Sequence, residues 1–266
     1  MNSCFVFSVG LCLCGLCLFA GAEERGQYKR VDGEALSFEI DLPQGEGPFP
    51  VVLYAHSWSG NLNQLKAYSQ YMATRGVAGV RINYRKMSEG NRFVDAKQDI
   101  LDAIEYVRDH AASYHLDMNR FGLAGASAGA VLTSLIAQET PDCISYIAFN
   151  GGFDLVHKGP GKFPDEKAMQ KMFGDSFDDT VLRACSSIYN IRENPPDTLL
   201  LHGTEDTTIG PDQPERFVAA LRAKGGQAKL VLYDGEEHGF FNSNRPHYQE
   251  IRDEVEEHLC RVFNLK

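Results

Sequence analysis

Six apolar segments of strand length recur along the chain, and segments with helical periodicity lie between them. The six apolar segments are residues 50–56, 77–84, 120–125, 144–150, 197–203 and 228–234. Because they are almost continuously apolar instead of alternating, they resemble strands covered on both faces by helices. The pattern predicts a series of βαβ units, and therefore an α/β fold with a mostly parallel, doubly wound sheet.

The intervening segments support this fold class. In residues 94–111, Ile100, Ile104 and Val107 recur with helical spacing while charged residues occupy the other side. Residues 35–42 alternate apolar and polar side chains, which predicts an antiparallel strand at one edge of the sheet. With 266 residues and no internal repeat, the chain is expected to form one α/β domain over residues 23–266.

The first 22 residues differ in composition from the rest. They contain no charged side chain, have an apolar middle, and end in Ala20-Gly21-Ala22 before the polar chain begins. This pattern predicts a signal peptide over residues 1–22 and a secreted or periplasmic protein without a stable membrane span after cleavage. Because no Lys or Arg precedes the apolar run, an uncleaved transmembrane anchor is the alternative, although the run barely reaches the ~18 residues needed.

Charge and cysteine content limit the expected partners. The net charge of -10 comes without any block of clustered Lys and Arg, so no nucleic-acid partner is expected. Four of the seven cysteines lie in the predicted signal peptide. For Cys143, Cys185 and Cys260 we favour three small buried side chains over one disulfide bond. Neither a zinc motif nor a dinucleotide fingerprint is present, so the sequence predicts no metal and no cofactor.

The residues around Ser127 are almost all glycine or alanine. The stretch FGLAGASAGAV, residues 121–131, contains a G-x-S-x-G motif between an expected strand, 120–125, and an expected helix, 128–138. A sharp strand-to-helix turn exposes the serine hydroxyl and tolerates only minimal neighbouring side chains. The backbone N–H of Ala128 would then face an incoming oxyanion at the start of the helix. Ser127 is the predicted nucleophile.

A serine hydroxyl needs a base to take its proton, and the base needs a carboxylate to orient it. Asp206 follows the expected strand 197–203, and His238 follows the strand 228–234, giving the order Ser, Asp, His. Asp206 is preferred as the acid because it lies in the motif His202-Gly203-x-x-Asp206; the competing acids are Glu205, Glu236 and Glu237. The other histidines are expected to have no catalytic role: His56 and His202 to brace loops, and His110, His115, His157, His247 and His258 to lie at the surface.

These motifs together resemble the α/β-hydrolase superfamily, and within it the carboxylesterases related to hormone-sensitive lipase and the small bacterial acyl-carbohydrate esterases. The resemblance covers about residues 49–263 and rests on VRINYR (80–85), DMNR (117–120), SAG (127–129), PPDTL (195–199), HGTED (202–206) and HGF (238–240). It implies an α/β-hydrolase fold with a small cap, about residues 153–195. It also implies that Ser127 is the nucleophile, His238 the general base and then acid, and Asp206 the orienting carboxylate.

One motif departs from this resemblance. The esterases usually carry H-G-G-G after the first parallel strand, whereas this chain has His56-Ser57-Trp58-Ser59-Gly60. The oxyanion hole needs only one or two backbone N–H groups there, so Ser57 or Trp58 is expected to join Ala128 as donor. Trp58 is expected either to wall the site or only to pack on its loop.

The cap region contains few apolar residues among many charges. Phe163, Met169, Met172, Phe173 and Phe177 are expected to anchor the cap to the body, and the composition does not match an amphipathic lipase lid. The leading hypothesis is an exported serine carboxylesterase that hydrolyses short-acyl esters, of small molecules or carbohydrates, through an acyl-enzyme.

Two other functions stay open. One is a peptidase of the prolyl-oligopeptidase type, although residues 23–49 are too few for the large gating domain of those enzymes. The other is a non-catalytic binding protein on a hydrolase scaffold, although such proteins typically lack a member of the triad. The natural ester is not specified by the sequence.

Overall fold

The structure is a computed structural model that describes residues 23–175 and 177–265. The predicted signal peptide, residues 1–22, lies outside the described residues. Within the described ranges, no helix combines the length and the apolar character needed to cross a membrane.

A single eight-stranded sheet forms the centre of the molecule, with strand order β1-β2-β4-β3-β5-β6-β7-β8. The strands are β1 (Glu23–Val31), β2 (Glu34–Asp41), β3 (Phe49–Ala55), β4 (Ala78–Ile82), β5 (Leu116–Ala126), β6 (Cys143–Phe149), β7 (Asp197–Gly203) and β8 (Ala228–Tyr233). Strands β3 to β8 pair in parallel, and β1 and β2 form an antiparallel extension beside β4. The predicted α/β class, the six parallel strands and the antiparallel edge are confirmed.

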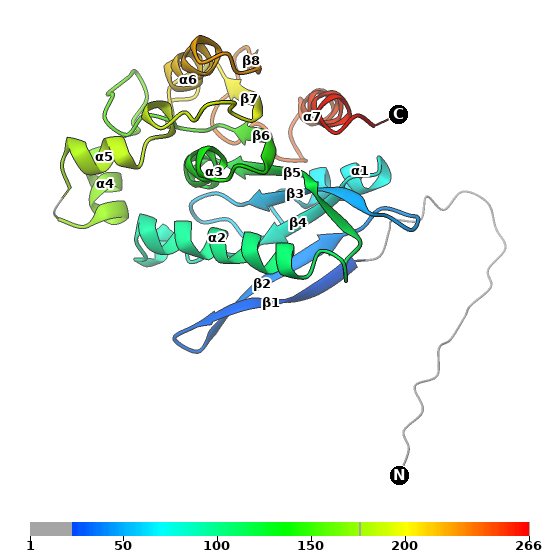
Figure 1. Ribbon diagram of the computed structural model, residues 1–266. Coiled ribbons are helices and arrows are strands. Elements are labelled where there is room, and N and C mark those ends of the chain that lie inside the picture. Colours follow the sequence, from blue (N-terminus) through cyan, green and yellow to red (C-terminus); the bar gives the residue numbers. More distant parts are fainter. Residues whose placement is uncertain (1–22, 176, 266) are drawn as a thin grey trace.

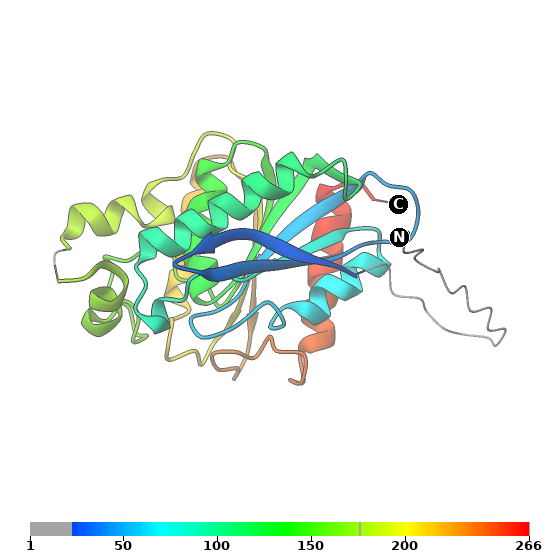
Figure 2. The same cartoon turned by 90° about the horizontal axis from the view of Figure 1, so that it is seen from below.

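Helices cover both faces of the sheet (Figures 1 and 2). They are α1 (Lys66–Thr74), α2 (Phe93–Asp109), α3 (Ala128–Glu139), α4 (Glu166–Phe173), α5 (Asp179–Ala184), α6 (Asp212–Ala223) and α7 (Tyr248–Val262), with 3-10 turns η1 (Met87–Glu89) and η2 (Ser187–Tyr189). One apolar core joins the sheet to α2, α3 and α6, and a second joins it to α1 and α7. This is the doubly wound arrangement that the continuous apolar strands predicted.

Strand β1 was not expected from the sequence, because EERGQYKRV has no apolar alternation. It forms because the chain reverses at Asp32-Gly33, where both residues have positive φ, 49° and 88°, as a tight hairpin turn requires. Lys29 Nζ then reaches Asp99 and Asp102 of α2, at 2.7 and 2.6 Å. Pairing with β2 and these ion pairs therefore hold a polar strand at the edge of the sheet.

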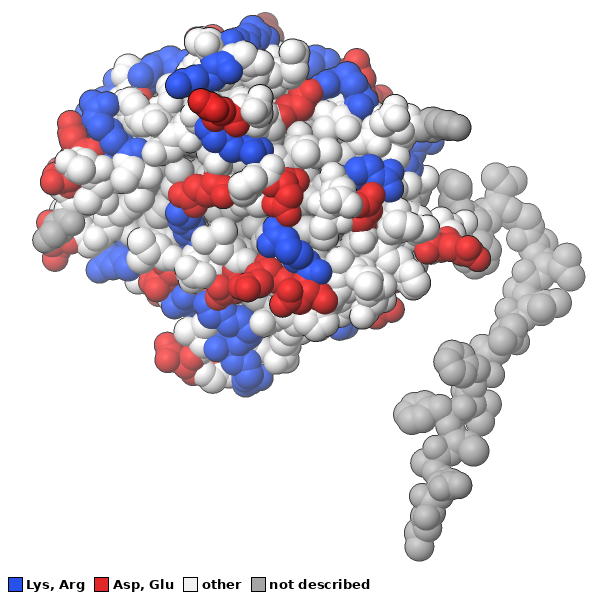
Figure 3. All heavy atoms as spheres, viewed as in Figure 1, with Lys and Arg blue, Asp and Glu red and all other residues white. Residues whose placement is uncertain are grey.

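The surface carries mixed charges. On the face shown in Figure 3, acidic and basic side chains are interspersed instead of forming a large area of one sign. The three cysteines in the described ranges are free thiols; Cys143 is buried, whereas Cys185 and Cys260 are only half-buried. The expectation of buried cysteines therefore holds fully for Cys143 alone.

His258 is not at the surface, and its prediction as a surface residue was wrong. His258 lies on the buried face of α7, with only 3% of the residue exposed. Its Nε2 lies 2.9 Å from Ser145 Oγ. The sequence pattern missed it because α7 places His258 on the same face as the apolar residues that cover the sheet.

Candidate active site

Ser127 lies at the turn between β5 and α3. Its φ of 51° and ψ of -115° are unusual for a residue with a side chain, and its N–H donates a 2.8 Å hydrogen bond to the carbonyl of Phe149. A Cβ atom on Gly125 would lie 2.4 Å from Thr133 Oγ1, and one on Gly129 would lie 2.3 Å from the His56 carbonyl. The small side chains around Ser127 are therefore a steric requirement of the turn, as the sequence predicted.

His238 joins the serine to a carboxylate. Its Nε2 lies 2.9 Å from Ser127 Oγ, and its Nδ1 lies 2.7 Å from Asp206 Oδ2. Both contacts are hydrogen bonds when Nδ1–H donates to Asp206 and Nε2 accepts from the serine hydroxyl. This is the histidine tautomer that a general base requires. The structure thus brings together the three predicted residues from loops after β5, β7 and β8.

Asp206 is a buried anion with several donors around it. Its Oδ1 accepts the N–H groups of Thr208 and Ile209, each at 2.9 Å, and its Oδ2 accepts the Asn150 amide at 2.8 Å. Burial by itself would raise the pKa of Asp206, but the hydrogen bond and charge of His238 and the Ile209 N–H together hold the pKa below its ordinary value. The carboxylate is therefore ready to orient the imidazole.

The three competing glutamates do not take this place. Glu205 is exposed, and the Glu236 carboxylate lies 3.4 Å from His247 Nε2 and 3.7 Å from the Arg245 guanidinium. Among the described residues, the recorded hydrogen-bond partners of the His238 imidazole are Ser127 and Asp206, so Glu237 is not one either. The choice of Asp206 as the acid agrees with this geometry.

The loop after β3 faces the start of α3, where the predicted oxyanion donors lie. The Ser57 N–H donates to Gln64 Oε1 at 2.8 Å, so that group is already engaged. In the part of the chain that the structure describes, no acceptor is recorded for the N–H of Trp58 or of Ala128. Of the two alternatives, Trp58 is thus the one with an available N–H. Sequence reasoning missed Gln64, which has no motif of its own.

His56 and His202 brace loops, as predicted. The His56 ring stacks on Tyr84 at 4.2 Å, and Tyr84 Oη donates to the His56 carbonyl at 2.6 Å. His202 Nε2 lies 2.8 Å from the carbonyl of Ile209, in the loop that carries Asp206. Burial lowers the pKa of His56 to about 4, so its ring is neutral at physiological pH.

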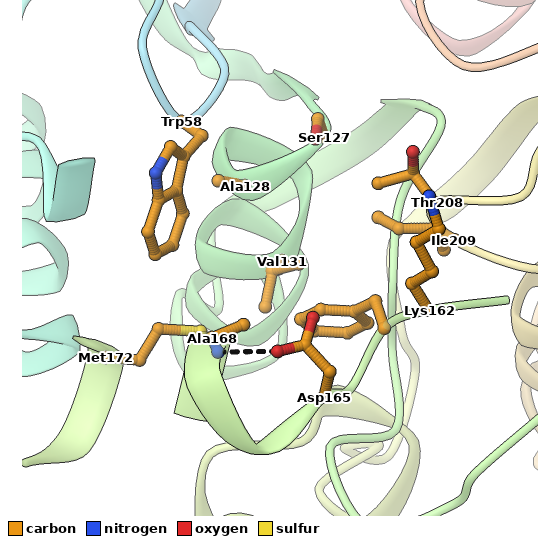
Figure 4. Close-up of a pocket in the computed structure, with 11 residues that line it drawn as sticks. Trp58, Ser127, Ala128, Val131, Lys162, Asp165, Ala168, Met172, Thr208 and Ile209 are labelled. Atoms are coloured by element: carbon orange, nitrogen blue, oxygen red, sulfur yellow. Dashed lines mark hydrogen bonds between the residues drawn. The ribbon is translucent and has the colours of Figure 1, made fainter. Parts of the chain in front are cut away.

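An apolar pocket of about 210 Å³ opens beside Ser127 (Figure 4). Its apolar lining is formed by Trp58, Ala128, Val131, Phe163, Ala168, Met172 and Ile209, with Lys162, Asp165 and Thr208 also at its wall. The Trp58 ring lies along one side, so this residue walls the site instead of only packing on its loop.

The segment predicted as a cap, residues 153–195, contributes directly to this pocket. Phe163 and Met172 line it, so these two side chains do more than anchor the segment to the body. Phe173 does anchor α4, because its ring stacks on Phe93 at 5.3 Å. Asp165 caps α4 by accepting the Ala168 N–H at 2.8 Å.

No cluster of three or more His, Cys, Asp or Glu side chains within the described ranges has the arrangement of a metal site. The site is instead built from a serine, an imidazole, a carboxylate, backbone N–H groups and an apolar pocket.

The parallel sheet and the serine at its strand-to-helix turn define an α/β-hydrolase. The BD-FAE family matches residues 38–221, most of the chain, and the chain belongs to that family. The chain is similar to the solved structure of Thermogutta terrifontis esterase 2 phosphonylated by sarin, with a TM-score of 0.81 and 26% sequence identity. The match covers 91% of this chain and 95% of the esterase chain.

The chain is also similar to several curated proteins that are much longer than it is. The probable isoprenylcysteine alpha-carbonyl methylesterase ICMEL1 of Arabidopsis thaliana is 26% identical over 229 residues, 75% of this chain and 48% of the relative. The uncharacterized peptidase YuxL of Bacillus subtilis is 26% identical over 84% of this chain and 36% of the relative. Esterase LipC of Mycobacterium tuberculosis is 24% identical over 75% of this chain and 55% of the relative. The chain thus spans about half the length, or less, of these relatives.

Proposed function

We propose that the protein is a serine carboxylesterase in which Ser127 is the nucleophile, His238 the general base and then acid, and Asp206 the orienting carboxylate. The observation that carries the proposal is the continuous chain of contacts, 2.9 Å from Ser127 Oγ to His238 Nε2 and 2.7 Å from His238 Nδ1 to Asp206 Oδ2. The esterase names of several relatives and of the structural neighbours support the same chemistry.

In the first half of the reaction, Ser127 Oγ attacks the ester carbonyl carbon while its proton passes to His238 Nε2. The carbonyl oxygen becomes an oxyanion and accepts hydrogen bonds from the N–H groups of Ala128 and Trp58. The intermediate collapses when Nε2 returns the proton to the leaving alkoxide, which departs as the alcohol and leaves an acyl group on Ser127. Water, deprotonated by His238, then releases the acid and restores the serine.

The pocket supports a short acyl group as substrate. Its volume is only about 210 Å³, and Trp58 together with Phe163 and Met172 from the cap region lines it beside Ser127. The charged residues of the cap region favour a soluble ester of a small molecule or a carbohydrate over a lipid surface. The composition of residues 1–22 supports export, and thus action outside the cytoplasm.

Hydrolysis of p-nitrophenyl esters tests the proposal. The protein lacking residues 1–22 should hydrolyse the acetyl and butyryl esters with much higher kcat/KM than the palmitoyl ester, without a rate increase above the critical micelle concentration. The Ser127→Ala variant should lose this activity. Preference for the palmitoyl ester would contradict the short-acyl assignment, and full activity of Ser127→Ala would contradict the nucleophile.

A peptidase is the second candidate, favoured by the similarity to the uncharacterized peptidase YuxL over 84% of this chain. The same triad could attack an amide, but an amide needs its poor leaving group protonated and held in a specific site. An acetyl or dipeptidyl anilide offered beside the matching ester separates the two. A peptidase would hydrolyse the anilide at a measurable rate as well as the ester, whereas the proposed esterase would act on the ester alone.

A further inference from the structure

Asn150 follows β6 and lies between the elements that carry Ser127 and Asp206. Its own N–H donates to the carbonyl of Leu201 in β7 at 3.0 Å. The carbonyl just before it, that of Phe149, accepts the N–H of Ser127 at 2.8 Å. The single peptide group between Phe149 and Asn150 therefore connects the turn of the nucleophile, through its carbonyl, to the strand that leads to the acid, through its N–H.

The side chain of Asn150 extends this connection to the carboxylate itself. Its Nδ2 lies 2.8 Å from Asp206 Oδ2, the same oxygen that receives His238 Nδ1–H. Asn150 is 0% exposed and Asp206 is 3% exposed, so water does not compete for this contact. With Thr208 and Ile209 on Oδ1, the Asn150 amide supplies the remaining protein donor that fixes how the carboxylate is rotated.

His202 does not replace this donor. Its Nε2 lies 3.4 Å from Asp206 Oδ2, but the shorter contact of that nitrogen, 2.8 Å, is to the carbonyl of Ile209. The single proton on Nε2 is thus directed to the backbone. The orientation of the Asn150 amide is also determined, because a flipped amide would place Oδ1 against Asp206 Oδ2.

Asn150 imposes a cost on the fold. Its φ of 51° lies in the left-handed region, which asparagine tolerates better than most residues with a side chain. Its Oδ1 is buried without any hydrogen-bond partner among the described residues. An unpaired buried acceptor destabilises a protein, so its presence in a folded core calls for an explanation, and a role in the active site is one.

We propose that Asn150 is a positioning residue of the active site: its amide holds the Asp206 carboxylate in the orientation that receives His238 Nδ1–H. The inference rests on the proposed esterase function and adds a residue to it. Asn150 is absent from the lining of the pocket beside Ser127, so it acts through Asp206 and not on the substrate. An apolar residue there would remove the donor, and an ionised carboxylate would add a like charge next to Asp206.

Two substitutions of similar size separate positioning from packing. Asn150→Leu removes the donor, and we expect kcat to fall on the order of tenfold or more with KM unchanged, because the donor serves a charged group. In Asn150→Asp the new carboxyl group donates while it is protonated and repels Asp206 once it ionises. Its activity relative to the unaltered protein should therefore be highest at acidic pH and fall as pH rises, whereas the deficit of Asn150→Leu should not recover at acidic pH.

The matched control is Ser145→Ala, near the other end of β6, where the buried hydroxyl contacts His258 instead of a triad residue. Rates are expressed per active site, counted by fluorophosphonate labelling, so that loss of folded protein does not mimic loss of kcat. Ser145→Ala should lose thermal stability and keep kcat. If Asn150→Leu behaved in the same way, the positioning role would be overturned.

A readout without substrate separates this inference from the esterase proposal. The low-field proton resonance of His238 Nδ1–H, identified by its loss in His238→Ala, reports the hydrogen bond to Asp206. We expect Asn150→Leu to shift or broaden it, and Ser145→Ala to leave it unchanged. An unaltered resonance with unaltered kcat in Asn150→Leu would overturn the inference. If instead the resonance responds but no ester is hydrolysed by any form, the esterase proposal fails while the positioning of Asp206 by Asn150 stands.

Discussion

His238 Nδ1 lies 2.7 Å from Asp206 Oδ2, although the two residues are 32 positions apart and follow different strands. The carboxylate is buried and receives backbone donors on Oδ1 and side-chain donors on Oδ2, whereas the neighbouring Glu205 is exposed. Two adjacent acidic residues therefore have opposite environments, and only one of them can orient the imidazole.

We expect Asp206→Asn to lower kcat by on the order of 10³-fold to 10⁴-fold. The amide can donate to Nδ1 and so favours the tautomer that leaves Nε2 protonated and unable to accept the serine proton. Ester hydrolysis by the purified variant measures the loss. Glu205→Gln is the matched control and should retain nearly full activity; a severe loss in Glu205→Gln beside a mild one in Asp206→Asn would mean that the acid has been misassigned.

The depth of the pocket depends on Phe163, which packs against Gly152. A Cβ atom on Gly152 would lie 2.6 Å from Phe163 Cε1, so the glycine leaves the space into which the ring fits. We expect Phe163→Ala to enlarge the pocket and raise the kcat/KM for hexanoyl and octanoyl esters relative to the acetyl ester. The acyl-chain profile, measured with a series of p-nitrophenyl esters, checks this.

Gly152→Ala tests the same contact in the opposite direction. The added methyl group displaces the Phe163 ring, and the expected result is a lower butyryl-to-acetyl ratio than in the unaltered protein. An unchanged chain-length profile in both Phe163→Ala and Gly152→Ala would show that this pocket does not hold the acyl group.

Acid should destabilise the fold in part through His258. Burial lowers the pKa of His258 to about 4 from the ordinary value of 6.5. Between these two values the unfolded chain takes up a proton that the folded protein does not, so the free energy of unfolding falls as pH decreases and levels off below about 4. The expected loss from this group is on the order of 3 kcal/mol.

Urea unfolding of the wild type and of His258→Gln, each at about pH 7 and about pH 4.5, measures this loss. The variant should be less stable at neutral pH but lose less stability on acidification. An equal pH dependence in both proteins would show that His258 is not one of the groups responsible.

The parallel part of the fold was predictable because its strands are buried on both faces and therefore read as continuous apolar runs. The same rule could not find β1, whose stability comes from its hairpin and from ion pairs to α2 that join residues far apart in sequence. His258 was misjudged because a histidine on a mostly charged helix gives no sign of its burial until the helix is packed.

In the candidate site too, local motifs predict some residues and not others. Ser127, Asp206 and His238 could be singled out as a candidate triad because each follows a strand within a recognisable motif. Gln64 and Asn150 were missed because their contacts, to the Ser57 N–H and to Asp206, depend on how loops fold and are encoded by no sequence motif. The pocket was predicted only in part. Trp58 was one of the residues expected to line it, but the positions of Phe163 and Met172 depend on how the cap region packs on the body.

Ser127 is proposed to be a nucleophile that His238 activates. Treating the protein with a fluorophosphonate, digesting it and locating the modified residue by mass spectrometry tests both residues at once. We expect stoichiometric labelling at Ser127 with parallel loss of ester hydrolysis, and almost no labelling in His238→Ala, because the hydroxyl then has no base. Labelling at a different residue, or labelling of Ser127 at the same rate in His238→Ala, would contradict the proposal.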